Sequence, residues 1–343
     1  MQNPAVNLNE DNEIQLSEAQ AYNGALSLDG LNISDLTGVQ KFIHVPQLFC
    51  RGNLLTTLDV SSMTDLTELY CDGNQISSLV LPPNLVKLNC YENSLSTLNL
   101  SDSPLLEEVF CYSNQLVSLD LSFNNNLRIL GCFENLLDNL DVSQNSLLEE
   151  LSCGFNLLSS LDVSLNPQLT SLDCRGNFLP FLSVTNNSLL TTLLCQDNSI
   201  TTLEIAGPNG PQLTLESLNC GGNQFLSLDL SDYSALSYIF CNNNPALVEL
   251  NIRNGNNINM VEIEGRPVAF NAQNNPSLSC IQVDDIDFAL SRLDWEKDAL
   301  TTYDTLCLCN INIPDLNFKS ALLANPEINT NGNDEIECLE AIL

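Results

Sequence analysis

A cysteine recurs along this 343-residue chain at a nearly constant interval. Seven of the nine steps are 21 residues and the other two are 19 and 25, which gives Cys50, Cys71, Cys90, Cys111, Cys132, Cys153, Cys174, Cys195, Cys220 and Cys241. Each cysteine is followed three residues later by an asparagine, namely Asn53, Asn74, Asn93, Asn114, Asn135, Asn156, Asn177, Asn198, Asn223 and Asn244. A fixed period of about 20–29 residues is typical of stacked-coil solenoids. The pattern therefore predicts a solenoid over roughly residues 45–280.

The segment 148–164 shows what one coil contains. Its letters LEELSCGFNLLSSLDVS alternate Leu151 and Cys153 with polar or small residues, which predicts a short strand. Such strands stack in parallel at about 4.7–4.9 Å, so the Leu and Cys side chains should form columns in the core. We expect Asn156 and its equivalents to hydrogen-bond backbone groups of neighbouring coils. A second apolar pair, here Leu161 and Val163, should line the opposite wall.

This unit resembles the leucine-rich repeat, whose pattern is LxxLxLxxNxL, with Cys in the place of the third Leu. The resemblance implies a right-handed, β-rich solenoid shaped as a horseshoe or arc, with a parallel sheet and a cap at each end. On this basis we divide the chain into an N-terminal cap (1–41), the repeats (42–279), a C-terminal cap (280–312) and the start of a second helix–loop cap (313–343). It also implies recognition of a protein or polysaccharide through the concave sheet, as in bacterial secreted or cell-surface members of this class.

The cysteines have two interpretations. Thiols that point inward in one column are expected to be reduced, small, packed apolar groups. A metal stack or a ladder of disulfides is the alternative. Outside the column, the segment from Cys280 to Cys307 resembles the C-terminal cap of the secreted bacterial proteins, which implies a Cys280–Cys307 disulfide. A disulfide favours an oxidising compartment, and hence an extracellular or bacterial cell-surface location.

The two ends of the chain are related to each other. Residues 3–19 align with residues 325–341 at a constant offset, and each copy resembles a 12-residue calcium loop. The calcium ligands would be Asn7, Asn9, Asp11, Glu13 and Glu18 in the first copy and Asn329, Asn331, Asn333, Glu335 and Glu340 in the second. A purely structural cap is the alternative. Residues 314–324 are predicted to form a helix, which could pack against another copy of the chain head to tail.

Composition excludes several functions. With 43 Asp and Glu against 10 Lys and Arg, the net charge is −33, which argues against nucleic acid or an anionic membrane as a partner. No apolar run approaches the roughly 18 residues of a membrane-spanning helix. Only one histidine, His44, is present, and no phosphate loop, activated nucleophile or HExxH motif occurs. We therefore expect a protein that is not an enzyme.

A recurring aspartate marks the second wall, in the pattern Leu-Asp-Val/Leu-Ser. It occurs at Asp59, Asp120, Asp141, Asp162 and Asp229. Such residues favour turns in which the carboxylate accepts local backbone amides. A column of calcium-binding carboxylates is the alternative.

Aromatic residues gather beside the cysteines in the first half of the chain. The candidate ligand-binding residues are Phe49, Tyr70, Tyr91, Phe110, Tyr112, Phe133 and Phe155. Because residues flanking an inward Cys point outward, we expect a solvent-facing aromatic band, which is a candidate interface. Two alternatives stay open: the rings could only stabilise the sheet, or the protein could be a structural unit of a tandem or head-to-tail assembly.

Overall fold

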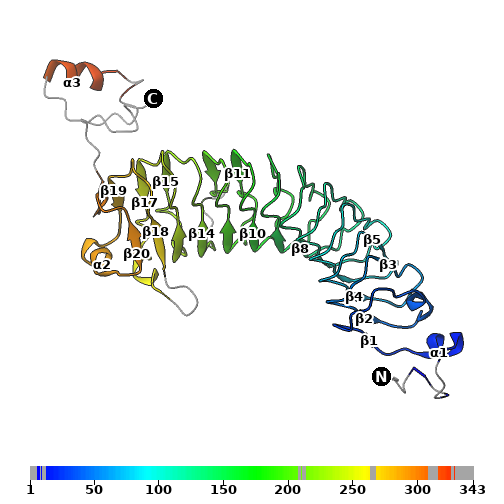
Figure 1. The fold of residues 1–343 in the computed structure, drawn as a ribbon. Helices are drawn as coiled ribbons and strands as arrows, with labels where there is room; N and C mark the ends of the chain where they lie inside the picture. The colour runs from blue at the N-terminus through cyan, green and yellow to red at the C-terminus, as the bar shows by residue number, and fades with distance from the viewer. Residues whose placement is uncertain are drawn as a thin grey trace. The chain divides into compact units, whose positions relative to one another are not determined.

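The computed structural model describes residues 6–7, 9, 13–207, 210, 214–262, 268–307, 316–325 and 328. The chain forms two compact units, residues 1–215 and 216–343, and each is described by itself. Figure 1 shows that each unit is built from short coils stacked one after another. No helix among the described residues is both long and apolar enough to span a membrane.

The first unit carries one long parallel sheet. Its order is β1-β2-β4-β6-β7-β8-β9-β10-β12, formed by Leu26–Ser27, Gln47–Phe49, Glu68–Tyr70, Lys87–Asn89, Glu108–Phe110, Ile129–Gly131, Glu150–Ser152, Ser171–Asp173 and Thr192–Leu194. Successive strands pair in the register of the repeat, so that Leu69 faces Leu88 and Leu88 faces Val109. Helix α1 (Leu16–Ala21) and the short 3-10 helix η1 (Val39–Lys41) precede β2. The predicted parallel solenoid is confirmed.

The opposite wall of the first unit is made of shorter strand pairs. They are β3 with β5 (Thr57–Asp59 and Ser78–Val80) and β11 with β13 (Phe181–Ser183 and Thr202–Glu204). In Figure 1, β3, β5 and β11 lie on the side of the coils away from β4, β8 and β10. The recurring aspartate forms a turn on this wall: the backbone N–H of Ser164 donates to Asp162 Oδ1 at 2.9 Å. Asp59, Asp120, Asp141 and Asp229 accept the equivalent bond, which confirms the predicted turns.

Between the two walls lie the columns of leucine and cysteine. Leu151 is 1% exposed and Cys153 is fully buried, and all ten repeat cysteines are free and buried. The thiols are therefore packed apolar groups, as predicted, and they form no ladder of disulfides. Burial raises the pKa of the Cys111 thiol to about 12, which keeps it protonated and unreactive near neutral pH.

The asparagines join neighbouring coils, as predicted. Asn156 Nδ2 donates to the carbonyl of Cys153 in its own coil and to that of Cys132 in the preceding coil, both at 3.1 Å. Its Oδ1 accepts from the backbone N–H of Leu137 at 3.0 Å. One side chain thus satisfies buried backbone groups of two coils, and the same set of bonds recurs at Asn135 and Asn177.

The second unit repeats the design. Its sheets have the orders β14-β16-β18-β20 and β15-β17-β19-β21. The strands are β14 (Ser217–Asn219), β15 (Ser227–Asp229), β16 (Tyr238–Phe240), β17 (Glu249–Asn251), β18 (Phe270–Ala272), β19 (Cys280–Gln282), β20 (Trp295–Lys297) and β21 (Thr302–Asp304). The other elements are η2 (Asn257–Asn259), α2 (Ile286–Ser291) and α3 (Leu316–Leu323).

Strand β20 ends its sheet with altered chemistry. Lys297 occupies the place that Ala272 holds in the preceding coil, and its Nζ donates to the carbonyl of Thr301 at 2.5 Å. Asp298 follows Lys297, and its carboxylate accepts hydrogen bonds from the backbone N–H groups of Asn274 and Asn275 at 2.8 and 2.7 Å. Charged side chains therefore satisfy backbone groups of this coil and of the preceding one at this end of the sheet.

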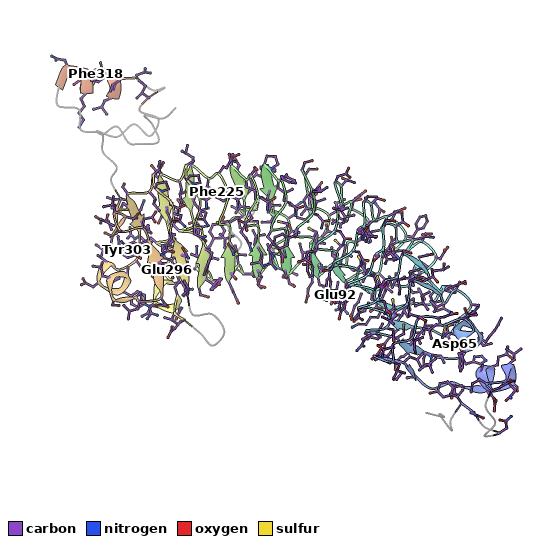
Figure 2. The ribbon with its side chains drawn as sticks, viewed as in Figure 1. Asp65, Glu92, Phe225, Glu296, Tyr303 and Phe318 are labelled. Carbon is purple, nitrogen blue, oxygen red and sulfur yellow. A yellow bond between two sulfur atoms is a disulfide. The ribbon has the colours of Figure 1, made fainter. Side chains whose placement is uncertain are left out.

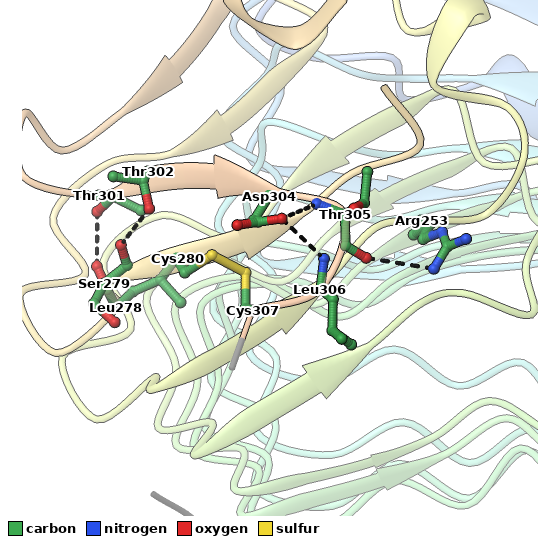
Figure 3. Close-up of a disulfide and its surroundings, with 10 residues drawn as sticks. All are labelled: Arg253, Leu278, Ser279, Cys280, Thr301, Thr302, Asp304, Thr305, Leu306 and Cys307. Carbon is green, nitrogen blue, oxygen red and sulfur yellow. Dashed lines mark hydrogen bonds between the residues drawn. A yellow bond between two sulfur atoms is a disulfide. The ribbon is translucent and has the colours of Figure 1, made fainter. Parts of the chain in front are cut away.

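The disulfide Cys280–Cys307 is present, as predicted (Figure 3). It joins the first residue of β19 to the segment that follows β21, across 27 residues of chain, with 5.7 Å between the Cα atoms. Nearby, the N–H of Thr302 donates to the carbonyl of Ser279 at 2.9 Å. The last coil of the second unit is therefore held both by the disulfide and by the parallel pairing of β19 with β21.

Candidate binding surface

The seven candidate aromatic residues lie on the outward side of the long sheet of the first unit, here called the strand face. Phe49, Tyr70 and Phe110 end strands β2, β4 and β7, whereas Tyr91, Tyr112 and Phe133 each follow the cysteine after a strand. Six of the seven rings are only half exposed, and Phe155 is 47% exposed. Five of the rings therefore cover one another in part, in two separate groups.

Phe49 and Tyr70 form the first group. Their ring centroids are 4.8 Å apart and nearly parallel, and the guanidinium carbon of Arg51 lies 4.3 Å from the centroid of Tyr70. Arg51 is also within 3.6 Å of the Asp72 carboxylate. The Arg51 guanidinium thus contacts the stacked rings and pairs with the Asp72 carboxylate at the same time.

Tyr91, Tyr112 and Phe133 form the second group, here called the central stack. Successive centroids are 4.3 Å apart, with interplanar angles of 9° and 11°. Burial raises the pKa of the Tyr91 hydroxyl, and the charge of Asp72, to which that hydroxyl donates, raises it further. The stack arises because three consecutive coils place an aromatic residue directly after the cysteine, at the spacing of parallel strands.

Phe110 lies beside the central stack. The Lys87 ammonium is 5.9 Å from the Phe110 centroid and forms an ion pair with Glu108. A Cβ on Gly131 in the next coil would come within 3.1 Å of the Phe110 ring, so the ring covers the space that this glycine leaves.

Phe155 is held in an unusual backbone conformation. Its φ is +50°, in the left-handed region that bulky side chains rarely adopt. A Cβ on Gly176 in the next coil would lie 2.5 Å from the Phe155 ring, so that glycine is required for the ring to lie there. Arg175 is 5.7 Å from the Phe155 centroid and 2.8 Å from Asp173.

The strand face carries more acids than bases. Its acidic residues are Glu68, Asp72, Glu92, Glu108, Glu134, Glu150 and Asp173, and its basic residues are Arg51, Lys87 and Arg175. Glu92, labelled in Figure 2, directly precedes the bridging Asn93 and is exposed. Each of the three bases is paired with a carboxylate of the same face. Arg51 and Arg175 were not among the residues selected from the sequence, although both directly follow a cysteine, as the tyrosines of the central stack do.

The described part of the chain contains no cluster of three or more His, Cys, Asp or Glu side chains arranged to hold a metal ion. Of the calcium-loop residues, Asn7, Asn9, Glu13 and Glu18 are described, and Asp11 is not. The Glu18 carboxylate accepts hydrogen bonds from the backbone N–H groups of Asn9 at 3.2 Å and of Gln15 at 3.0 Å. All five candidate ligands of the second copy, Asn329, Asn331, Asn333, Glu335 and Glu340, lie outside the described residues, so calcium binding stays a prediction.

Helix α3 lies within the predicted helix 314–324. Its Phe318 is 57% exposed and is labelled in Figure 2. Packing of this helix against another copy of the chain stays a prediction.

The comparisons with known proteins agree on the fold. No protein-family model and no curated protein matches the chain. Among solved structures, an internalin (InlF) of Listeria monocytogenes is 18% identical, with 86% of this chain and 92% of the internalin covered and a TM-score of 0.59. The leucine-rich effector YopM of Yersinia pestis is 24% identical, with 76% and 73% covered and a TM-score of 0.58. The functional domain of InlJ from Listeria monocytogenes, which includes a cysteine ladder, is 26% identical, with 80% and 71% covered and a TM-score of 0.47. The period, the parallel sheet and the likeness to the InlF and YopM structures together establish that this chain has the leucine-rich-repeat fold.

Proposed function

We propose that this protein is a non-enzymatic interaction module that binds a protein partner through the strand face of its first unit. The observation that carries the proposal is the clustering of seven aromatic side chains with a surplus of acids on that one face. Aromatic residues concentrated on a surface and rimmed by charge favour an interface.

The geometry of the rings favours a protein over a polysaccharide. Sugar binding would need a row of free ring faces, but in the central stack the rings of Tyr91, Tyr112 and Phe133 lie face to face at 4.3 Å, so only the two outermost faces are left uncovered by the stack. The ring edges and the two tyrosine hydroxyls are most of what remains for contact, which suits side chains packed at a protein interface. Polysaccharide binding is the competing outcome of the experiment below.

An extracellular or cell-surface location, with a role in adhesion, belongs to the same proposal. It is supported by the Cys280–Cys307 disulfide, because such bonds persist in oxidising compartments. The competing proposal is a structural unit of a longer assembly, which the related segments 3–19 and 325–341 favour.

The experiment is a binding screen of the purified chain against panels of extracellular proteins and of polysaccharides. We compare the wild type with a variant that removes the central stack, Tyr91→Ala/Tyr112→Ala/Phe133→Ala. The matched control, Phe123→Ala/Leu147→Ala/Leu165→Ala, removes exposed apolar side chains that lie outside the strand face. Thermal unfolding of all three proteins separates loss of binding from loss of folding.

Protein binding that the control keeps and the stack variant loses is the expected result. Binding that both variants keep would place the interface elsewhere. Binding to polysaccharides alone would replace the protein partner, and a lack of any binding together with a concentration-dependent mass in light scattering would favour the assembly unit.

A further inference from the structure

An apolar groove lies at the start of the first unit, where Figure 1 shows α1 and β1. Its volume is about 620 Å³, and its lining comes from α1, β1, η1 and the residues next to them. The apolar lining residues include Ile14, Leu16, Leu26, Leu28, Val39 and Phe42. Ile14 is 48% exposed and Leu16 is 55% exposed, so part of this apolar surface faces solvent.

The groove is apolar because it borders the end of the core. Leu26 of β1 faces Leu48 of β2 in register, so Leu26 continues the column of core leucines into the first coil. Among the described strands β1 pairs only with β2, whereas β2 has a neighbour on both sides. The outer side of the first coil is bordered instead by α1 and η1, and both line the groove.

The groove is electrically neutral, in a chain whose net charge is −33. Asp35 and Lys41 are the two charged residues among its described lining residues. The Asp35 carboxylate is occupied by its own turn, where it accepts hydrogen bonds from the N–H and the hydroxyl of Thr37 at 2.7 and 2.6 Å. Because acidic copies of the chain repel one another, a neutral apolar surface is the place where a second copy can approach most easily.

The segment that lines the groove has a relative at the other end of the sequence. Residues 3–19 align with residues 325–341, and the alignment places Ile336 at the position of the groove residue Ile14. Helix α3 (Leu316–Leu323) ends just before this second copy begins. The chain therefore contains a helix that is adjacent in sequence to a copy of the groove-lining segment.

Helix α3 has a surface that suits the groove. Phe318, Ala321 and Leu322 lie on one face of it, because residues three and four apart are neighbours on a helix. Phe318 is 57% exposed, Ala321 is exposed and Leu322 is half-exposed. Segment 314–324 carries one acid and one base, so it is neutral, as the groove is.

From these observations we infer that helix α3 of a second copy of this chain docks in the groove, with the face of Phe318, Ala321 and Leu322 against the apolar lining. Docking of a helix into an apolar groove through residues at this spacing is a recurring mode of recognition. Helix and groove are different surfaces, so the contact is head to tail, and each added copy brings a further groove and a further helix. The inference goes beyond the proposed function, because it uses none of the seven aromatic residues of the strand face.

The test is sedimentation equilibrium of the full chain over a hundredfold range of concentration, at about 0.15 M salt, where long-range repulsion is screened. The mass of the wild type should rise with concentration. The groove variant is Leu16→Asp and the helix variant is Phe318→Asp, and each places a charge on one of the two apolar surfaces. Since docking would bury that charge without a partner, we expect each variant to raise the dissociation constant at least about tenfold.

The matched controls are Leu31→Asp and Phe178→Asp. They make the same changes at side chains that are 59% and 60% exposed and belong neither to the groove nor to α3. Both should associate as the wild type does. Thermal unfolding of all five proteins checks the fold, and Leu16→Asp should keep it because Leu16 is the first residue of α1, where an acid is compatible with the helix.

A mixture of the two site variants tests the direction of the contact. Phe318→Asp keeps the groove and Leu16→Asp keeps the helix, so each variant alone should be monomeric. An equal mixture should form a dimer with one copy of each variant, and this dimer should not grow further, because the two surfaces left over both carry the substitution.

A wild type that stays monomeric at every concentration would overturn the inference, and a helix docked in the groove of its own chain would give that result. Equal weakening by the controls would also overturn it, since the chain would then respond only to added charge. So would a mixture that stays monomeric. Failure of the central-stack variant to lose a partner would count against the proposed function alone, because that variant leaves the groove and α3 unchanged.

Discussion

At the scale of single residues, the asparagine after each cysteine is the side chain that most directly joins one coil to the next. Asn156 is 4% exposed and bonds backbone groups of its own coil and of the preceding one. A second buried column, Asn124, Asn145, Asn166 and Asn187, lies near the other wall and was not anticipated; each Nδ2 donates to carbonyls of the preceding coil. Its members precede Asn, Ser or Pro in a variable turn, so only the constant spacing of 21 residues could have revealed them.

Replacing Asn156 should destabilise the protein strongly. In Asn156→Ala the N–H of Leu137 loses its partner inside the core, and the carbonyls of Cys132 and Cys153 each lose one of two donors, which should lower the free energy of unfolding by about 2–4 kcal/mol. Denaturant unfolding measures the change. Asn126→Ala, at an exposed position of the neighbouring turn, is the control. A loss in Asn156→Ala no larger than in the control would contradict the bridging role.

Asp162 should contribute to stability in a pH-dependent way. Hydrogen bonds from the side chain and backbone of Ser164 lower the pKa of this carboxyl below its ordinary value of 3.8. Because the folded protein holds the ionised form, its contribution is fully present above that ordinary pKa and is lost as the pH falls through the lowered one. Asp162→Asn keeps the acceptor and does not titrate.

The measurement for Asp162 is urea unfolding of the wild type and Asp162→Asn between pH 6 and pH 2.5. We expect the wild type to lose stability relative to the variant over the acid end of that range. A constant difference between the two proteins at all pH values would show that the turn does not respond to the charge of Asp162.

At the scale of elements, each strand has only two or three residues and depends on its neighbours in the stack. Strand β21 closes the second wall of the second unit, where the N–H of Val283 donates to the carbonyl of Asp304 at 2.9 Å. The Cys280–Cys307 disulfide lies beside this pair. The end of the second unit is therefore held by the disulfide in addition to the hydrogen bonds that pair β21 with β19.

Removing the disulfide should loosen that end. With a sequence separation of 27 between the cysteines, Cys280→Ala/Cys307→Ala should cost about 3.5 kcal/mol in the chain-entropy account. Hydrogen exchange should become faster at the amides that pair β19 with β21 and stay unchanged in the first unit. Cys153→Ala, which changes a free buried thiol, is the control. Equal exchange at β21 with and without the disulfide would contradict this role.

At the scale of the whole molecule, charge is the dominant property. A net charge of −33 makes the folded chain repel itself and attracts basic partners. Screening weakens both effects. Raising sodium chloride from about 0.02 to 0.5 M should therefore raise the melting temperature.

Calorimetry at the two salt concentrations tests this expectation. Asp120→Asn/Asp141→Asn/Asp162→Asn, which lowers the charge at three exposed turns, should show a smaller increase with salt than the wild type does. A melting temperature that falls with salt in both proteins would show that ion pairs such as Arg128–Glu149 outweigh the repulsion.

The sequence by itself determined the solenoid, the inward leucine and cysteine columns and the role of the asparagines. The reason is that identical coils must stack with their residues in register, so a period in the chain becomes a column in space. The resemblance to secreted proteins supplied the disulfide pairing, which spacing alone leaves open. Only the tertiary structure decided how the aromatic residues group, because stacking depends on which columns on the strand face lie side by side and on where a glycine, such as Gly131 or Gly176, leaves room for a ring. It likewise decided that Arg51 and Arg175 lie against rings, since the contacts of a long flexible side chain are set by its neighbours in other coils.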